Sequence, residues 1–307
     1  MHILLIFLDG IGLGDDDPAV NPFAVANTPT LHALANGNRW LRDTQRQDSE
    51  RALFVPTDPR LGVPGRPQSG TSQAAILTGR NIPQIVGEHY GPKPNESTRK
   101  LLAEGNFFKE LVAQGKSAAI INAYPPHLLR EIKRGKRLPS SIQLASLEAG
   151  IPLFTMDTLY SGDALSEDWT GQGWRSHLGF DDIPVYTPFE AGVRMVELSR
   201  RYDFAFFSHW MTDTIGHRGP LEDGIASLEL FDSVMAGALS VWDDAEGLML
   251  ITSDHGNMEE IGSRKHTEND VPTLIIGEKR HEFADGLVDL TGLVPRMRKF
   301  LLPDASV

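Results

Sequence analysis

The sequence predicts an α/β sandwich built around a mainly parallel sheet. Three observations lead to this fold class: short strands that are apolar on both faces, apolar helical stripes between them, and a polar or glycine residue after each strand. Strands are predicted at residues 3–8, 118–122, 204–208, 248–253 and 273–277. Because ligands of such sheets bind beyond the carboxyl ends of the strands, we expect functional residues there.

Helical patterns separate these strands. A stripe of apolar residues over 101–112 predicts one helix that ends at Gly115. A second helix is predicted over 193–198, just before a strand, and a third runs from Pro220 to Trp242 with apolar residues three and four positions apart. Strands that alternate with helices of this length are typical of α/β proteins.

Residues 123–188 break this alternation. They are rich in proline, glycine, serine and aromatic residues and have only weak periodicity. We predict an inserted lid or substrate-recognition region here, which divides the core into residues 1–122 and 189–307. An ordinary elaborated loop region is the alternative interpretation.

The composition limits the possible partners. The chain has 307 residues, of which 40% are hydrophobic and 23% charged, so it can form a proper core. Its net charge of −12 disfavours nucleic acid and anionic membranes, so we expect neither as a partner. The apolar run near the N-terminus is too short for a signal sequence or a membrane span, which favours a cytoplasmic protein. The oligomeric state cannot be read from the sequence.

The chain contains no cysteine. Disulfides, thiolate zinc sites, iron–sulfur clusters and a cysteine nucleophile are therefore excluded. A metal ion in this protein must be held by aspartate, glutamate, histidine or a hydroxyl oxygen.

Four clusters of such residues lie at predicted strand or helix ends. They are Asp9 after the first strand, Ser69 before a short helical run that stops at Gly79, Asp213 and His217 after the strand at 204–208, and Asp254 and His255 after the strand at 248–253, with His266 eleven residues later. A turn, a helix cap or a surface pair would explain each cluster alone. Together, three aspartates, three histidines and a serine suffice for two sites for zinc or manganese. A serine bound to a cation loses its proton more easily and can act as a nucleophile.

These motifs resemble the alkaline phosphatase superfamily, in the metalloenzyme branch that includes cofactor-independent phosphoglycerate mutase and phosphopentomutase. The resemblance rests on Phe-Leu-Asp9-Gly, Ser69 ten residues before Gly79, Asp213-x-x-Gly-His217, Thr-x-Asp254-His255-Gly-Asn and His266-Thr-x-x-x-Val-Pro, which occur in the family's order. It implies an alkaline-phosphatase-like three-layer α/β/α sandwich with a small inserted lid.

The resemblance also implies roles for these residues. One divalent ion, Mn or Zn, would be held by Asp9, Ser69, Asp254 and His255, and a second by Asp213, His217 and His266. Ser69 would be the nucleophile that is transiently phosphorylated.

Further residues near these motifs are candidates for substrate contacts. Arg80 and Lys265 are the cations nearest the ligand motifs, although a surface salt bridge is an equally good interpretation of each. His89, soon after Arg80, and His209, close to Asp213, are candidates to face the site, with surface or core packing as the alternative. The basic run from Arg130 to Arg137 either grips a second anionic group of the substrate or is a solvated loop.

The family resemblance does not select one reaction, because the superfamily runs several chemistries on one metal core. A type I sulfatase requires proline and arginine two and four residues after its nucleophile, where this chain has Thr71 and Gln73. The small lid favours hydrolysis of a phosphate mono- or diester, so we expect a small phosphorylated substrate. A phosphomutase is the alternative, and a non-catalytic binding relative is an alternative of another class.

Overall fold

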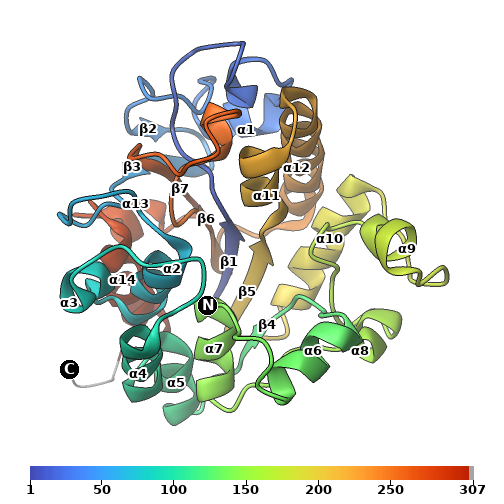
Figure 1. Ribbon diagram of the computed structural model, residues 1–307. Coiled ribbons are helices and arrows are strands. Elements are labelled where there is room, and N and C mark those ends of the chain that lie inside the picture. The colour runs from blue at the N-terminus through green and yellow to red at the C-terminus, as the bar shows by residue number, and fades with distance from the viewer. Residues whose placement is uncertain (304–307) are drawn as a thin grey trace.

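The computed structural model describes residues 1–303 and confirms the α/β class. One seven-stranded sheet lies between two layers of helices, with strand order β2-β3-β7-β6-β1-β5-β4 (Figure 1). The strands are β1 (His2–Leu8), β2 (Gln47–Asp48), β3 (Ala52–Thr57), β4 (Ala118–Ile120), β5 (Phe204–His209), β6 (Gly247–Thr252) and β7 (Val271–Ile276).

The central strands β4, β5, β1 and β6 are parallel, as predicted, but β7 is antiparallel to both β6 and β3. The strand predicted at residues 273–277 therefore runs against its neighbours. Because of this reversal, the start of β7 lies at the edge of the sheet where β1, β5 and β6 end. The segment that precedes β7, which includes His266, is thereby brought to the same edge.

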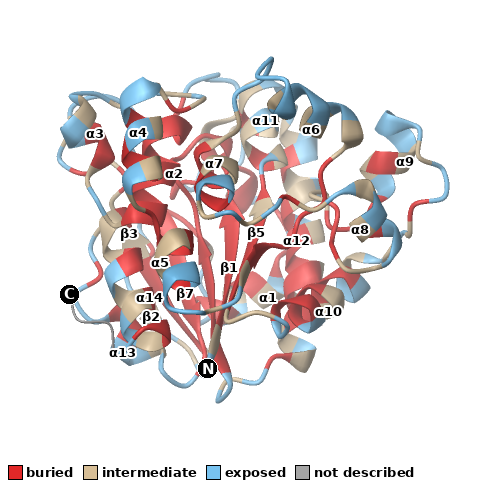
Figure 2. Ribbon diagram, turned by 90° about the horizontal axis from the view of Figure 1, so that it is seen from below, coloured by how far each residue is buried: buried red, intermediate tan, exposed pale blue. Residues whose placement is uncertain are grey.

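Both faces of the sheet are covered, which gives three layers. In β1, Ile3 and Leu5 contribute to one apolar core and Leu4 and Ile6 to the other, as the two-residue period of a strand requires. Figure 2 shows the buried strands between helices whose outer surfaces are exposed.

Different helices cover the two faces. The first face carries α2 (Ser69–Thr78), α3 (Ile82–Val86), α4 (Glu96–Glu104), α5 (Phe107–Ala113), α7 (Ser141–Glu148), α13 (Arg280–Ala284), η3 (Leu290–Gly292) and α14 (Leu293–Leu301). The second carries η1 (Pro22–Ala24), α1 (Pro29–Leu34), α10 (Pro188–Ser199), α12 (Leu221–Val241) and η2 (Met258–Glu260).

The predicted helices before β5 and after Pro220 are confirmed as α10 and α12. The stripe over 101–112 is two helices, α4 and α5, because the side chain of Asn106 accepts a hydrogen bond from the backbone N–H of Lys109 and starts a new helix. By length and composition α12 could cross a membrane, but it packs along α10 and buries Leu228 and Met235 in the core of the sandwich.

The segment 123–188 contains α6 (Pro126–Lys133), α7, α8 (Met156–Tyr160) and α9 (Gln172–Leu178). Its backbone continues the sheet beyond β4 through a parallel bridge between Asn122 and Leu165. Helix α7 packs on α2, α4 and α5, so this part of the segment joins the main core. The division into a core and a lid stays a prediction.

Candidate metal centre

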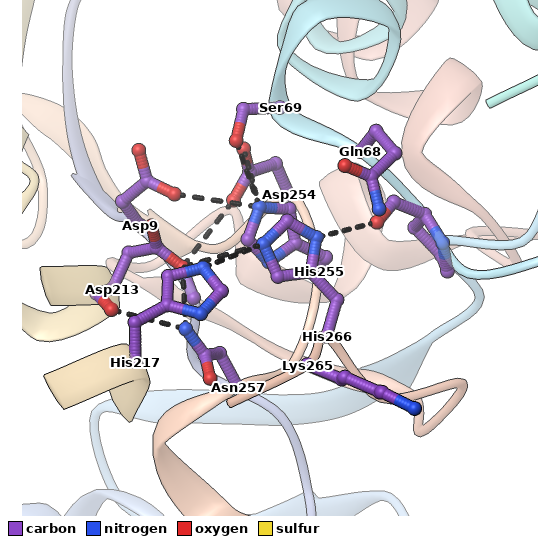
Figure 3. A network of polar contacts seen from close by, with 12 residues as sticks. Asp9, Gln68, Ser69, Asp213, His217, Asp254, His255, Asn257, Lys265 and His266 are labelled. Atoms are coloured by element: carbon purple, nitrogen blue, oxygen red, sulfur yellow. Dashed lines mark hydrogen bonds and ion pairs between the residues drawn. The ribbon is translucent and has the colours of Figure 1, made fainter. Parts of the chain in front are cut away.

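The carboxyl edge of the sheet gathers the predicted metal ligands (Figure 3). Asp9 directly follows β1, and Asp254 and His255 follow β6, the strand beside it. Asp213 and His217 follow β5 on a helix, α11 (Met211–Arg218), where they lie one turn apart. Three segments that are distant in sequence therefore meet at one place.

Ser69 is the first residue of α2 and is buried. Its neighbour Gly70 must lack a side chain, because a Cβ atom there would lie 2.6 Å from the carbonyl oxygen of Tyr90. On another side, the hydroxyl of Ser141 donates to the carbonyl of Gly70 at 2.6 Å. The turn that carries Ser69 is thus held between the 90–93 loop and the start of α7.

Four of the ligands form a buried group. The Nε2 atom of His255 lies 2.9 Å from the Ser69 hydroxyl and 3.5 Å from a carboxylate oxygen of both Asp9 and Asp254. Within the described residues, Asp9 Oδ1 and His255 Nδ1 have no hydrogen-bond partner although both are buried. Such atoms are rare in folded proteins and indicate a missing partner, such as an ion or water.

The other three ligands form a more open group. Asp213 Oδ1 lies 3.5 Å from His217 Nε2 and 3.6 Å from His266 Nε2, and the two Nε2 atoms are 3.2 Å apart. The Nδ1 atom of each ring faces a backbone carbonyl, that of Arg264 for His217 and that of Pro67 for His266. A carbonyl only accepts, so each Nδ1 carries the proton and each Nε2 presents a lone pair. Three acceptors therefore face one another with no donor between them.

A divalent cation fits these donor sets. A tetrahedral ion with ligands at about 2.1 Å separates its donor atoms by roughly 3.4 Å, close to the separations of 3.2, 3.5 and 3.6 Å in the open group. Asp213 also lies within reach of Asp9 and His255, so its carboxylate stands between the two groups. The donor sets are consistent with the divalent metals expected from the sequence.

The pKa shifts of the site's side chains also indicate a bound cation. Burial and the charge of Asp213 raise the pKa of Asp254 to about 7. Burial, followed by the charges of Asp254 and Asp213, raises the pKa of Asp9 well above its usual value. Burial and the nearby His266 lower the pKa of His255 well below the ordinary histidine value. The carboxylates repel one another here, and a bound cation would relieve that repulsion.

Side chains that the sequence reasoning missed hold these ligands in place. Gln73 donates to Asp254 at 3.1 Å and to Asp9 at 3.3 Å, and Asn257 donates to Asp213 at 2.6 Å. A sequence signal existed for Gln73, which lies one helical turn after Ser69 on the same face of α2. Such supporting contacts orient ligands and tune metal affinity.

A residue of the 123–188 segment supports α11 in the same way. The carboxylate of Glu167 accepts from the backbone N–H groups of Trp210 and Met211, both at 3.2 Å, at the start of this helix. Burial and the charge of Asp168 raise the pKa of Glu167 to about 8. His209 also turns toward this region, with Nδ1 2.9 Å from the Glu167 carbonyl, so the structure does not bring its ring into the ligand cluster.

Of the other candidate substrate contacts, two line the cleft above Ser69 and one does not reach the site. His89 lines the cleft above Ser69, with Nε2 3.2 Å from the carbonyl of Val63. Lys265 also lines this cleft, and Figure 3 shows its ammonium turned away from the carboxylates. Arg80 lies just beyond the other end of α2, 3.7 Å from Glu104, so the structure does not bring it to the site.

Comparison with known proteins agrees with this geometry. The family model of the Metalloenzyme superfamily matches residues 189–294, the stretch that holds Asp213, His217, Asp254, His255 and His266. The chain is also similar to the 2,3-bisphosphoglycerate-independent phosphoglycerate mutase of Methylobacillus flagellatus, at 33% identity over 127 residues. Residues 189–294 are therefore similar to the Metalloenzyme superfamily.

The sequence match to these relatives is partial. The Methylobacillus alignment covers 38% of this chain and 25% of the relative. The corresponding mutase of Rhodopseudomonas palustris is 33% identical over 131 residues, which cover 40% of this chain and 25% of the relative. The matched region thus spans about a quarter of the length of these curated relatives.

Solved structures share the fold over nearly the whole chain. The PH0037 protein of Pyrococcus horikoshii has a TM-score of 0.57 at 17% identity and covers 100% of this chain and 98% of its own. Alkaline phosphatase from the Antarctic bacterium TAB5 has a TM-score of 0.52 at 12% identity, covering 98% and 97%. Phosphoglycerate mutase of Leishmania mexicana has a TM-score of 0.51 at 12% identity, covering 98% and 95%.

Proposed function

We propose that this protein is a two-metal phosphoesterase that hydrolyses phosphate mono- or diesters through a phosphoserine at Ser69. The observation that carries the proposal is the 2.9 Å contact between the Ser69 hydroxyl and His255, beside the converging acceptors. In this proposal one ion is held by Asp9, Ser69, Asp254 and His255, and the other by Asp213, His217 and His266.

The proposed reaction has two displacements at phosphorus. The Ser69 oxygen forms a bond to phosphorus while the bond to the leaving alcohol breaks, and the alcohol departs with the proton that Ser69 gives up. Water then attacks the phosphoserine, inorganic phosphate leaves and Ser69 regains a proton. The bound cations would favour the ionised serine and offset charge on the phosphoryl oxygens.

The chain's own residues fix the geometry of this reaction. Ser69 is held at the start of α2, where the helix dipole favours an anion. Gln73 and Asn257 orient the carboxylates through the hydrogen bonds described above. An open cleft above Ser69 gives water access to the phosphoserine, which favours hydrolysis over retention of the phosphoryl group.

The named relatives support a second candidate function, phosphomutase activity. Both curated relatives described above are phosphoglycerate mutases, but the alignments cover only 25% of each. A mutase must retain the released intermediate until it is rephosphorylated in another position. A hydrolase has no such requirement.

One experiment distinguishes three hypotheses: a hydrolase, a phosphomutase and a non-catalytic relative. The protein loaded with Mn²⁺ or Zn²⁺ is incubated with an aryl phosphate and an aryl diester in ¹⁸O-labelled water, with Ser69→Ala as control. Labelled inorganic phosphate and phosphoserine on the Ser69 peptide are expected. With a phosphohydroxy acid offered as a third substrate, isomerised product without phosphate release would identify a mutase. Absence of both bound metal and turnover would identify a non-catalytic relative.

We also propose Mn²⁺ or Zn²⁺ as the resident ions, because carboxylate, imidazole and hydroxyl ligands suit both. Reconstitution with each ion followed by phosphate-release assays tests this choice. The expected partner is a small phosphorylated molecule rather than nucleic acid or a membrane, and the cytoplasmic location stays a prediction from the sequence.

A further inference from the structure

Three cations line the cleft that opens above Ser69. They are Arg66 from the loop before α2, and Arg264 and Lys265 from the loop before β7. All three are exposed, and within residues 1–303 none forms an ion pair or donates a side-chain hydrogen bond. Ten of the 20 arginines of the chain form ion pairs with carboxylates in the described residues, whereas the three cations at this cleft do not.

The two loops that carry these cations also hold the open metal group. The carbonyl of Pro67, next to Arg66, faces His266 Nδ1 at 2.8 Å, and the carbonyl of Arg264 faces His217 Nδ1 at 3.2 Å. Arg264 has a left-handed backbone, with φ of 57°, which costs energy in a residue with a side chain. The hydrogen bonds to His217 and His266 thus hold the two loops that carry the cations. The same hydrogen bonds set the distance between the metal centre and the three cations.

The cleft is larger than the reacting group needs. Its volume is about 750 Å³, in the range that accommodates a small organic ligand. Ser69, Asp213, His217 and His266 line its inner part, and Lys265 points away from the carboxylates. Lys265 therefore lies on the side of the cleft where the remainder of a substrate would extend, and Arg66 and Arg264 line the same cleft. The other carboxylate at this cleft besides Asp213 is Glu88, which is exposed.

We propose that Arg66, Arg264 and Lys265 form an anion-binding rim that selects phosphate esters whose leaving group carries a second negative charge. This inference rests on the proposed function, since it assumes that the phosphoryl group binds at Ser69. The substrate class is a compact organic phosphate with a carboxylate or second phosphate on the alcohol side. Arginine recognises both groups by paired hydrogen bonds, and lysine adds a point charge.

A matched pair of substrates tests the rim. The phosphate esters of 4-hydroxybenzoate and 4-hydroxybenzamide have similar shapes but differ by one negative charge. The metal-loaded protein is expected to prefer the benzoate ester in kcat/KM. Arg66→Gln, Arg264→Asn and Lys265→Gln should each reduce this preference by roughly 2- to 5-fold, in line with single exposed charge contacts. Asparagine is chosen at position 264 because it tolerates the left-handed backbone.

Two controls make the result specific. Lys100→Gln, on the exposed surface of α4, should leave the preference unchanged. The benzamide ester should be turned over by the rim variants nearly as fast as by the wild type, which excludes damage to the metal centre. The preference should also fall with added salt, because exposed charges are screened. An unchanged preference in all three rim variants, or its loss in Arg137→Gln instead, would overturn the proposal.

A binding measurement separates this inference from the proposed function. Metal-loaded Ser69→Ala is titrated with both esters by calorimetry, with and without Arg66→Gln. If neither ester is turned over by the wild type but rim-dependent binding of the benzoate ester persists, the rim stands and the proposed hydrolysis fails. If both esters are hydrolysed and bind equally with and without Arg66, the rim fails and the hydrolysis stands.

Discussion

The two ligand groups of the candidate centre differ in burial and in what supports them. The side chains of Asp254 and His255 are 0% exposed and that of Asp9 is 12% exposed. In the open group the Asp213 side chain is 22% exposed and that of His217 is 32% exposed. The buried group is attached to the ends of the adjacent strands β1 and β6 and to the start of α2, whereas the open group is attached to α11 and to the loop before β7.

This difference suggests a division of labour. Strand ends in the middle of a sheet cannot move without disturbing both apolar cores, so the buried group is suited to fix the nucleophile. The open group lies at the cleft and on segments that other residues must hold, such as Glu167 at the start of α11. We expect its ion to exchange more readily and to contact the substrate. Four predictions test this contrast.

The largest effect is expected from removal of the nucleophile in the buried group. Ser69→Ala should lower kcat for an aryl phosphate by about 10³-fold or more and abolish trapped phosphoserine, because the first displacement loses its attacking atom. The matched control is Ser72→Ala, also buried on α2, whose hydroxyl makes no hydrogen bond within the described residues. Phosphoserine that still forms in Ser69→Ala would refute the assignment.

Metal removal should proceed in two steps. When chelator is titrated into the loaded protein, the ion of the open group should leave first because two of its three ligands, Asp213 and His217, are only half-buried. Elemental analysis of desalted samples should pass through one ion per chain before reaching zero. His217→Ala should be purified with one ion, and wild-type protein that loses both ions together would remove the distinction between the groups.

Loss of the support at α11 should weaken one ion selectively. Glu167→Ala should lower the affinity for the more weakly held ion by about 10-fold, in the range seen when residues that orient ligands are removed. Glu167→Gln keeps an acceptor for the N–H groups of Trp210 and Met211 and should restore most of the affinity. Asp163→Asn, a half-buried acid of the same segment that pairs with Arg201, is the control and should bind both ions as the wild type does.

The smallest expected effect is on the pH dependence of protein stability. The pKa of Asp254 is raised to about 7 in the metal-free fold, so the folded state binds this proton more tightly than the unfolded chain. Its contribution to the stability of the metal-free protein therefore falls as pH rises from about 4 to about 7. Metal binding requires the ionised carboxylate and should oppose this loss.

Thermal unfolding with and without Mn²⁺ measures this effect. The increase in Tm that the metal causes should be greater at about pH 8 than at about pH 5. Asp254→Asn should remove most of the pH dependence of that increase. A metal-induced shift that is equal at both pH values would contradict the raised pKa.

Sequence patterns predicted the central strands and the candidate ligands because both depend on local features. The buried run before Asp9 and the run before Asp254 are apolar on both faces, which only a covered strand requires. The helix that begins at Ser69 and ends before Gly79 was predicted from its boundary residues. These patterns were sufficient to predict that the candidate ligands lie at one edge of one sheet.

Other features had no local signal. The break between α4 and α5 depends on the cap at Asn106, which an apolar stripe conceals. The supporting roles of Glu167 and Asn257 depend on contacts across 43 and 44 residues of chain. Arg66 and Arg264 carry no motif, and only the fold shows that they share a cleft with Ser69.

The sequence by itself determined the fold class, the absence of thiol chemistry and the identity of seven candidate ligands, since each follows from residue types and their order. The tertiary structure decided how those ligands divide in space and which cations accompany them. The reversal of β7 is the clearest case, because strand direction is set by pairing with β6 and β3. That pairing brings the residues before β7 to the edge where the parallel strands end, and so places His266, Arg264 and Lys265 beside Ser69.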